Sequence, residues 1–275
     1  MNKFSEKDLK KKSFELRKKI IEISYLNKAH HIGSELSCID ILCSLFHNYI
    51  NLDLKNIYEK NSDIFILSKG HAALAYYVLL VEKKFFTYEE LKKNFLTNNG
   101  KLGGHPDSNS MHGVQINTGS LGYGISLGSG FAFVSKKNNL RRRVFVVLGD
   151  GECNEGSIWE SLIFASHHKL NNLIIIVDHN HLQGLGNTES VLDMKSLVDK
   201  FNSFGCETFE INGHDFNEIE NVFCKILEKN DNSLPKVILA STIKGKGVKS
   251  MESKLSSHYE TLTTERFEDI MKDLY

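Results

Sequence analysis

Five apolar runs, separated by amphipathic segments, limit the possible folds of this chain more than any other feature. The runs are largely continuous rather than alternating, which is typical of parallel strands whose two faces are both covered. The segments between the runs repeat their apolar residues at helical spacing. Right-handed crossovers between such strands predict an α/β fold, a doubly wound parallel sheet with helices on both faces. The expected strands are residues 63–68, 143–150, 172–180, 206–212 and 235–242.

Helices are expected before and between these strands. A helix is expected in the N-terminal segment 7–28, and a second around 38–49. The other expected helices are residues 69–85, 155–170, 193–204 and 215–229. Because the chain has only two prolines, no low-complexity linker and no internal repeat, we expect residues 1–275 to form one domain.

The composition argues against two classes of partner. Lys and Arg total 34, as do Asp and Glu, so the formal net charge is zero, whereas nucleic-acid-binding proteins usually carry a basic excess. The basic run at residues 7–19 is interpreted as a solvated helix face. No apolar run approaches a membrane span, and the N-terminus lacks a signal-peptide core. Five cysteines without a CxxC pair predict a reduced, cytoplasmic protein. From the charge balance and the missing membrane span, we expect it to bind neither nucleic acid nor membrane.

The second expected strand ends in Gly149-Asp150-Gly151. Ligands of open parallel sheets bind beyond the carboxyl ends of the strands, and the following helix offers free N–H groups to a phosphate. Asn180 follows the next strand, so it should share this sheet edge with Asp150. A carboxylate, an amide oxygen and a backbone carbonyl would suit Mg²⁺ with two diphosphate oxygens. Taken alone, the glycine motif could also be a simple tight turn.

In this context the residues resemble the cofactor motif of thiamine diphosphate enzymes, and of transketolases in particular, in which Gly-Asp-Gly precedes an Asn by about 25–30 residues. Further segments follow the order of the transketolase family over nearly the whole chain. They are "HHIGSELSCIDIL" with His31, "LSKGHAA" with His71, "GGHPD" with His105, "INTGSLGYGIS" with Gly119 and Leu121, and "TIKGKGVKSMESKLSSHYE" with His258.

The resemblance implies a cofactor-binding role for most of these residues. Mg²⁺ would be held by Asp150, Asn180 and the backbone carbonyl of Leu182. The residues expected to contact the diphosphate are Gly151, His71 and His258. Gly119 and Leu121 are expected to lie against the aminopyrimidine of thiamine diphosphate. Glu155 and Glu160 would either contact the half of the cofactor site on the other domain or have a purely structural role.

The resemblance also implies which residues handle protons. His31, His105 and His258 would face the substrate hydroxyls and share in proton transfer. Histidine suits this work because its unperturbed pKa lies near neutrality. The expected reaction is transfer of a two-carbon ketol unit from a ketose to an aldose, both being sugars or sugar phosphates.

Only one of the family's domain types is matched. The chain resembles the pyrophosphate-type domain, whereas the pyrimidine-type domain, with its activating glutamate, and the C-terminal domain have no counterpart among the matched segments. The resemblance therefore implies the N-terminal subunit of a split transketolase, expected to form an α2β2 heterotetramer with a pyrimidine-domain subunit. Alone, the chain should be catalytically silent.

Several alternatives remain at this point. A non-catalytic cofactor-binding or assembly subunit would keep the same fold, and the E1 subunit of a 2-oxo-acid dehydrogenase shares the magnesium motif. A nicotinamide-dependent oxidoreductase would use the glycines around residues 122–128, although their GxGxxxG spacing departs from the fingerprint. A zinc hydrolase would use the paired histidines, such as His179 and His181, and Cys153 could be a nucleophile.

Overall fold

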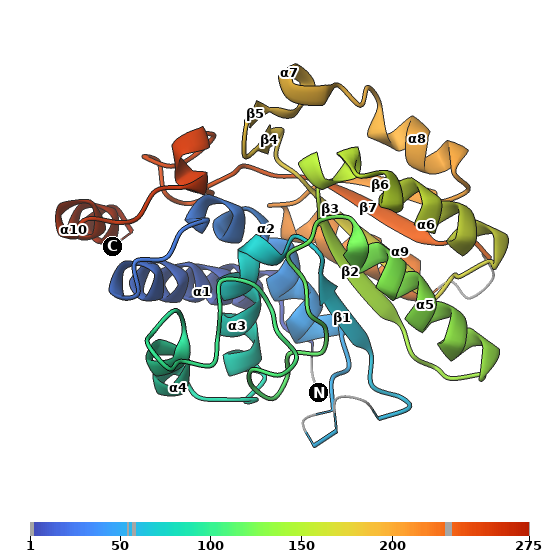
Figure 1. Ribbon diagram of the computed structural model, residues 1–275, viewed down its shortest axis with the longest axis horizontal. Coiled ribbons are helices and arrows are strands. Elements are labelled where there is room, and N and C mark those ends of the chain that lie inside the picture. Colours follow the sequence, from blue (N-terminus) through green and yellow to red (C-terminus); the bar gives the residue numbers. More distant parts are fainter. Residues whose placement is uncertain (1–2, 54, 57–58, 229–232, 275) are drawn as a thin grey trace.

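A computed structural model describes residues 3–53, 55–56, 59–228 and 233–274. Its main feature is a five-stranded sheet in the order β1-β2-β3-β7-β6, in which every neighbouring pair is parallel. The strands are β1 (Ile64–Leu67), β2 (Val144–Gly149), β3 (Leu173–His179), β6 (Glu207–Asn212) and β7 (Lys236–Ser241). All five expected strands are therefore present, and the predicted doubly wound parallel sheet is confirmed (Figure 1).

Side chains alternate between two apolar cores, one on each face of the sheet. On β2, Phe145 and Val147 belong to one core, while Val144, Val146 and Leu148 belong to the other. The helices of the first core are α1 (Glu6–Leu26), α2 (Ile32–Ser44), α3 (Ala73–Glu82), α9 (Phe216–Glu228) and α10 (Thr264–Asp273). Those of the second are α5 (Tyr123–Lys137), α6 (Gly156–His167) and α8 (Leu197–Ser203). Burial of both faces explains why β1, β2, β3 and β7 are almost continuously apolar, whereas the edge strand β6 alternates and is only partly buried.

Several elements differ from the sequence-based expectation. The second helix begins at Ile32, earlier than expected, and ends in a π-helical turn, Leu45–Tyr49. Elements that were not expected are α4 (Tyr88–Asn94), α5, α7 (Thr188–Leu192), α10 and the hairpin of β4 (Leu182–Gln183) and β5 (Gly186–Asn187). Glycines disfavour a helix over α5, yet a Cβ on Gly128 would lie 2.5 Å from Val146. The close packing of Gly128 on the sheet thus outweighs the low helix propensity of glycine.

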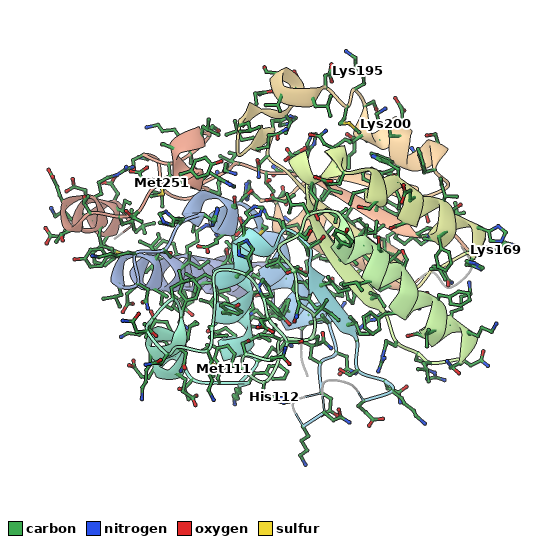
Figure 2. All side chains as sticks on the ribbon, in the orientation of Figure 1. Met111, His112, Lys169, Lys195, Lys200 and Met251 are labelled. Carbon is green, nitrogen blue, oxygen red and sulfur yellow. The ribbon has the colours of Figure 1, made fainter. Side chains whose placement is uncertain are left out.

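The loops that follow the strands meet at one edge of the sheet because all strands run the same way. The segment after β7 then returns across the start of α2, and its own Met251 is buried in the first core (Figure 2). No helix among the described residues is long and apolar enough to cross a membrane.

Candidate active site

A cavity of about 320 Å³ lies at the carboxyl edge of the sheet. Most of the predicted cofactor residues line it, namely His71, Leu121, Asp150, Gly151, Glu155, Asn180, Leu182 and His258. A larger hollow of about 540 Å³ lies at the opposite edge, among residues such as Arg141 and Lys236, but none of the predicted residues lines it. The chemistry expected from the sequence is therefore concentrated in the smaller cavity.

Asp150 is a buried carboxylate with backbone donors on both of its oxygens. Gly151 N–H donates to Oδ1 at 2.8 Å, and His181 N–H donates to Oδ2 at 2.6 Å. Burial and the neighbouring Asp178 raise the pKa of Asp150 to about 6. Among the described residues, no Lys or Arg forms an ion pair with Asp150. A buried carboxylate of this kind is suited to a cation that the chain itself does not provide.

Asn180 lies beside Asp150 with its amide orientation set by its neighbours. Its Nδ2 donates to Asp178 Oδ2 at 3.2 Å and to Ser37 Oγ at 3.1 Å, while Leu182 N–H donates to its Oδ1 at 3.0 Å. Because an ionised carboxylate only accepts hydrogen bonds, Asp178 must face the amide nitrogen rather than the oxygen. Asp150, Asn180 and Leu182 thus provide the hard oxygen ligands that Mg²⁺ prefers, and the residues present fit the ion.

Four histidines from distant segments converge beside the cavity. The ring centroid of His31 lies 4.7 Å from that of His258, 5.5 Å from that of His71 and 6.4 Å from that of His105. Burial lowers the pKa of His31 to about 4 and that of His258 to about 3, and it holds the pKa of His71 well below its usual value. These three rings are therefore neutral near pH 7, so each can donate through one nitrogen and accept through the other.

Close backbone contacts hold His31 and His258 together. His31 precedes α2 in the left-handed region, with φ of 69°, and its N–H donates to the carbonyl of His258 at 3.1 Å. Gly33 allows this approach, since a Cβ there would lie 2.1 Å from Ser257 Oγ. The C-terminal segment consequently forms one wall of the site.

The glycine-rich loop before α5 contributes His105 and Gly119. Gly119 has φ of 134°, and a Cβ there would come within 2.9 Å of the His105 ring. Tyr77 Oη donates to the His105 carbonyl at 3.1 Å, which ties the loop to α3. Of the two predicted glutamates, Glu155 lies at the cavity, whereas Glu160 lies on the exposed side of α6 and does not line it.

Two buried lysines were missed by reasoning from the sequence. Lys244 is 2% exposed, its Nζ donates to Ser34 Oγ at 3.0 Å, and burial together with Lys69 lowers its pKa to about 8. Lys69 forms a buried ion pair with Asp178 and donates to the Ser34 carbonyl at 3.2 Å. Each lysine immediately precedes a glycine just beyond a strand, and that position was an available signal.

The rival sites find little support. Among the described residues, no group of three or more His, Cys, Asp or Glu side chains is arranged to hold a metal ion, and the His179 and His181 rings pack in a tilted arrangement with their centroids 4.1 Å apart. Burial raises the pKa of Cys153 well above its usual value, which makes it a poor nucleophile. Gly124 packs against Ser68 rather than lining the cavity.

Comparison with known proteins identifies the family. The family described as "Transketolase, thiamine diphosphate binding domain" matches residues 15–274. The chain belongs to the transketolase family. An apulose-4-phosphate transketolase subunit of Phocaeicola vulgatus is 36% identical over 258 residues, 94% of this chain and 90% of the relative. The 6-deoxy-6-sulfo-D-fructose transketolase subunit SqwG of Clostridium sp. (strain MSTE9) is 35% identical, covering 89% of this chain and 88% of the relative.

Solved structures agree with this assignment. A transketolase from Campylobacter jejuni superposes with a TM-score of 0.90 at 28% identity, covering 98% of this chain and 43% of that one. The chain is thus a transketolase-type enzyme subunit that corresponds to the N-terminal, thiamine diphosphate binding part of the family. The predicted family, fold and transketolase function are confirmed, whereas the magnesium ion, the partner's identity and the individual residue roles stay predictions.

Proposed function

We propose that this chain binds Mg²⁺ and the diphosphate of thiamine diphosphate in the 320 Å³ cavity and works with a pyrimidine-domain partner subunit. Together they would transfer a two-carbon ketol unit from a ketose to an aldose. The observation that carries the proposal is that an oxygen ligand set, Asp150, Asn180 and Leu182, shares one cavity with the buried Lys244.

The charges of the cavity suit a metal diphosphate. Lys69 is compensated by its ion pair with Asp178, and Asp150 would be compensated by a bound Mg²⁺. Lys244 forms no ion pair among the described residues, so its positive charge and the excess charge of the metal would face the ligand. Gly151 brings its backbone to the same cavity, where a diphosphate could approach.

The histidines of this chain would hold and move protons around the substrate. Thiamine diphosphate, when bound, would supply the nucleophilic carbon for reaction with the ketose carbonyl. Because His31, His71 and His258 are neutral, they can accept a proton from a substrate hydroxyl or orient that hydroxyl by donation. His105, on the exposed loop, would meet the substrate at the cavity mouth.

An anionic sugar is the substrate class we favour. The two relatives of matching length are named for a sugar phosphate and for a sulfonated sugar. These names support a sugar or sugar phosphate carrying a negative charge away from the reacting carbonyl.

The outer face of α5 and α6 is where we place the partner. Its exposed apolar side chains are Tyr123, Leu127, Val134 and Ile163, which are 44–62% exposed. This face adjoins the cavity, because Leu121 precedes α5 and Glu155 precedes α6. The relatives of matching length are themselves named as subunits, which supports the presence of a partner subunit, and the assembly we propose is α2β2. The free cysteines agree with a cytoplasmic enzyme.

Reconstitution tests this function. The chain is mixed with the pyrimidine-domain subunit expected from a neighbouring reading frame, and ketol transfer is assayed over a panel of ketose donors and aldose acceptors. Transfer should require both subunits, Mg²⁺ and thiamine diphosphate. Transfer by the chain alone, or undiminished transfer by the complex after Mg²⁺ is chelated, would contradict the proposal.

A further inference from the structure

The loop after β7 holds Lys244 between two backbone positions, Ile243 and Lys246, that are each fixed by a hydrogen bond. On one side, Ile243 N–H donates to His214 Nε2 at 2.9 Å. On the other, Arg17 Nε donates to the carbonyl of Lys246 at 3.0 Å. The residue that enters the cavity is therefore flanked by contacts from α1 and from the loop after β6.

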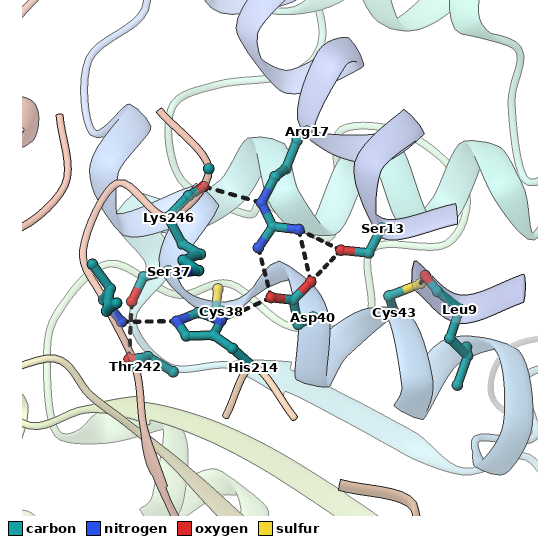
Figure 3. A network of polar contacts seen from close by, with 12 residues as sticks. Leu9, Ser13, Arg17, Ser37, Cys38, Asp40, Cys43, His214, Thr242 and Lys246 are labelled. Atoms are coloured by element: carbon teal, nitrogen blue, oxygen red, sulfur yellow. Dashed lines mark hydrogen bonds and ion pairs between the residues drawn. The ribbon is translucent and has the colours of Figure 1, made fainter. Parts of the chain in front are cut away.

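Both anchors bind the same carboxylate, that of Asp40 in α2. Its Oδ2 accepts from His214 Nδ1 at 2.7 Å and from Arg17 Nη2 at 2.6 Å, and its Oδ1 accepts from Arg17 Nη1 at 2.7 Å (Figure 3). Ser13 Oγ completes the set of donors. Burial opposes ionisation of Asp40, but Arg17 and His214 hold its pKa well below the usual range. The buried Asp40 carboxylate thus orients both Arg17 and His214, the two residues that hydrogen-bond to the loop.

Asp40 also determines which nitrogen of His214 carries the proton. A carboxylate only accepts, so Nδ1 must carry the hydrogen that points at Asp40. Nε2 must then be the bare acceptor that Ile243 N–H requires. A protonated His214 would present a hydrogen to that N–H and lose the contact, so the arrangement calls for the neutral ring.

We propose that Asp40, Arg17 and His214 form a positioning cluster that holds the Lys244 ammonium in the cofactor cavity. Helix α2 contacts Lys244 in two ways. Ser34 accepts directly from Lys244 Nζ, and Asp40 holds Arg17 and His214, which hydrogen-bond to the backbone on either side of Lys244. Gly33, also in α2, accepts from Gly245 N–H at 2.9 Å. None of the three cluster residues touches the cavity, so they act through Lys244. The inference rests on the proposed diphosphate site for its functional meaning.

Chemical labelling of the full chain tests the geometry without any ligand. The variants are His214→Phe, which cannot accept from Ile243 N–H, and His214→Gln, whose side-chain oxygen can. The acetylation rate of each lysine is measured by mass spectrometry. We expect Lys244 to react about five- to tenfold faster in His214→Phe, since local opening of the loop exposes the amine, and to return toward the wild-type rate in His214→Gln.

Lys69 provides an internal control, because it is buried in the same cavity but held by Asp178 instead. Its rate should not change in either variant. An unchanged Lys244 rate in His214→Phe, or equal acceleration of Lys69 and Lys244, would overturn the inference. If His214→Phe does not fold, Arg17→Met takes its place, with the same expectations and the same overturning results.

A separate arm keeps this result distinct from the proposed function. In the wild-type chain assembled with its partner, Mg²⁺ and thiamine diphosphate should slow acetylation of Lys244. Absence of that protection would count against the diphosphate site, while the comparison of the His214 variants would still decide the positioning role.

Discussion

Asn180 Nδ2 donates a hydrogen bond to Asp178 Oδ2 at 3.2 Å, and this contact turns the amide oxygen to the other side, where it accepts from Leu182 N–H at 3.0 Å. Asp178 also pairs with Lys69 and accepts from Ser37 Oγ at 2.7 Å and Thr242 Oγ1 at 2.5 Å. A ligand residue oriented by a neighbouring acid is a common arrangement around protein metal sites. The buried acid therefore connects the stability of the sheet edge with the expected metal site.

Asp178→Asn should destabilise the chain strongly. The change leaves Lys69 as a buried cation without an ionised partner, and breaking such a pair typically costs about 3–5 kcal/mol. Urea unfolding followed by circular dichroism measures the loss. The double variant Lys69→Met with Asp178→Leu should lose less than Asp178→Asn alone, and a larger loss in the double variant would contradict the reasoning.

Asp150→Asn should stabilise the ligand-free chain at pH 7 while removing metal-dependent cofactor binding. The folded-state pKa of about 6 lies above the ordinary value of 3.8, so stability is lost as pH rises from about 4 through 6. Removing the charge should raise the free energy of unfolding by about 1 kcal/mol, a net value that includes the loss of one backbone hydrogen bond to the side chain. Thermal unfolding and calorimetric titration with Mg²⁺ and thiamine diphosphate check the two effects. Tight Mg²⁺-dependent binding by the variant would refute the metal assignment.

The histidine cluster should make the chain sensitive to acid. Burial lowers the pKa of His31 to about 4 and of His258 to about 3, below the value near 6.5 of an unfolded chain. Between these values the unfolded state binds more protons, so stability should fall as pH drops from about 6.5 toward 4. Unfolding curves of a His31→Asn, His258→Asn double variant should show a flatter pH dependence in this window. An unchanged slope would mean that other groups dominate.

Lys244→Met should weaken binding of Mg²⁺ and thiamine diphosphate about 10- to 100-fold in the assembled enzyme, because a charge-assisted contact is lost. In the ligand-free chain, burial lowers the pKa of Lys244 to about 8, so wild-type affinity should decline where the amine loses its proton. A bound anion would move that decline to higher pH, and the variant should not show it. Lys246→Met is the matched control, since its side chain lies outside the cavity. Equal losses in both variants would argue against a specific anion contact.

Ile163→Asp should prevent assembly without unfolding the chain. Ile163 is 60% exposed on α6, so the substitution creates no buried charge in the free subunit, but it would place one in the proposed interface. Size-exclusion chromatography with the partner subunit measures assembly. Phe14→Asp on the exposed side of α1 serves as the control and should assemble normally. Normal assembly of Ile163→Asp would exclude this face as the docking surface.

Sequence reasoning reached the sheet and the histidines by different routes. The strands were predictable because both faces of a parallel sheet are buried, and their residues show it directly. His31, His71, His105 and His258 were found by resemblance, and the structure brings them together. What local pattern cannot show is a contact between distant segments.

Three features illustrate this limit. In the sequence, Lys244 looks like an ordinary surface lysine, whereas in the structure it is buried and donates to Ser34. Asp40 reads as a polar position within a helix until Arg17 and His214 reach it from other elements. Gly128 lowers the helix propensity of α5, and only the structure shows that the strand side chains beneath it leave no room for a Cβ.

The return of the C-terminal segment to α2 has a consequence for biosynthesis. His31 leaves the ribosome long before His258, although the His31 N–H donates its hydrogen bond to the His258 carbonyl. The cavity wall therefore cannot close until the segment around His258 has been translated. A nascent chain stalled before Met251 would carry the loops expected to bind the metal but would lack the C-terminal wall and its His258. The site between α2 and the C-terminal segment is therefore complete only after translation has passed His258.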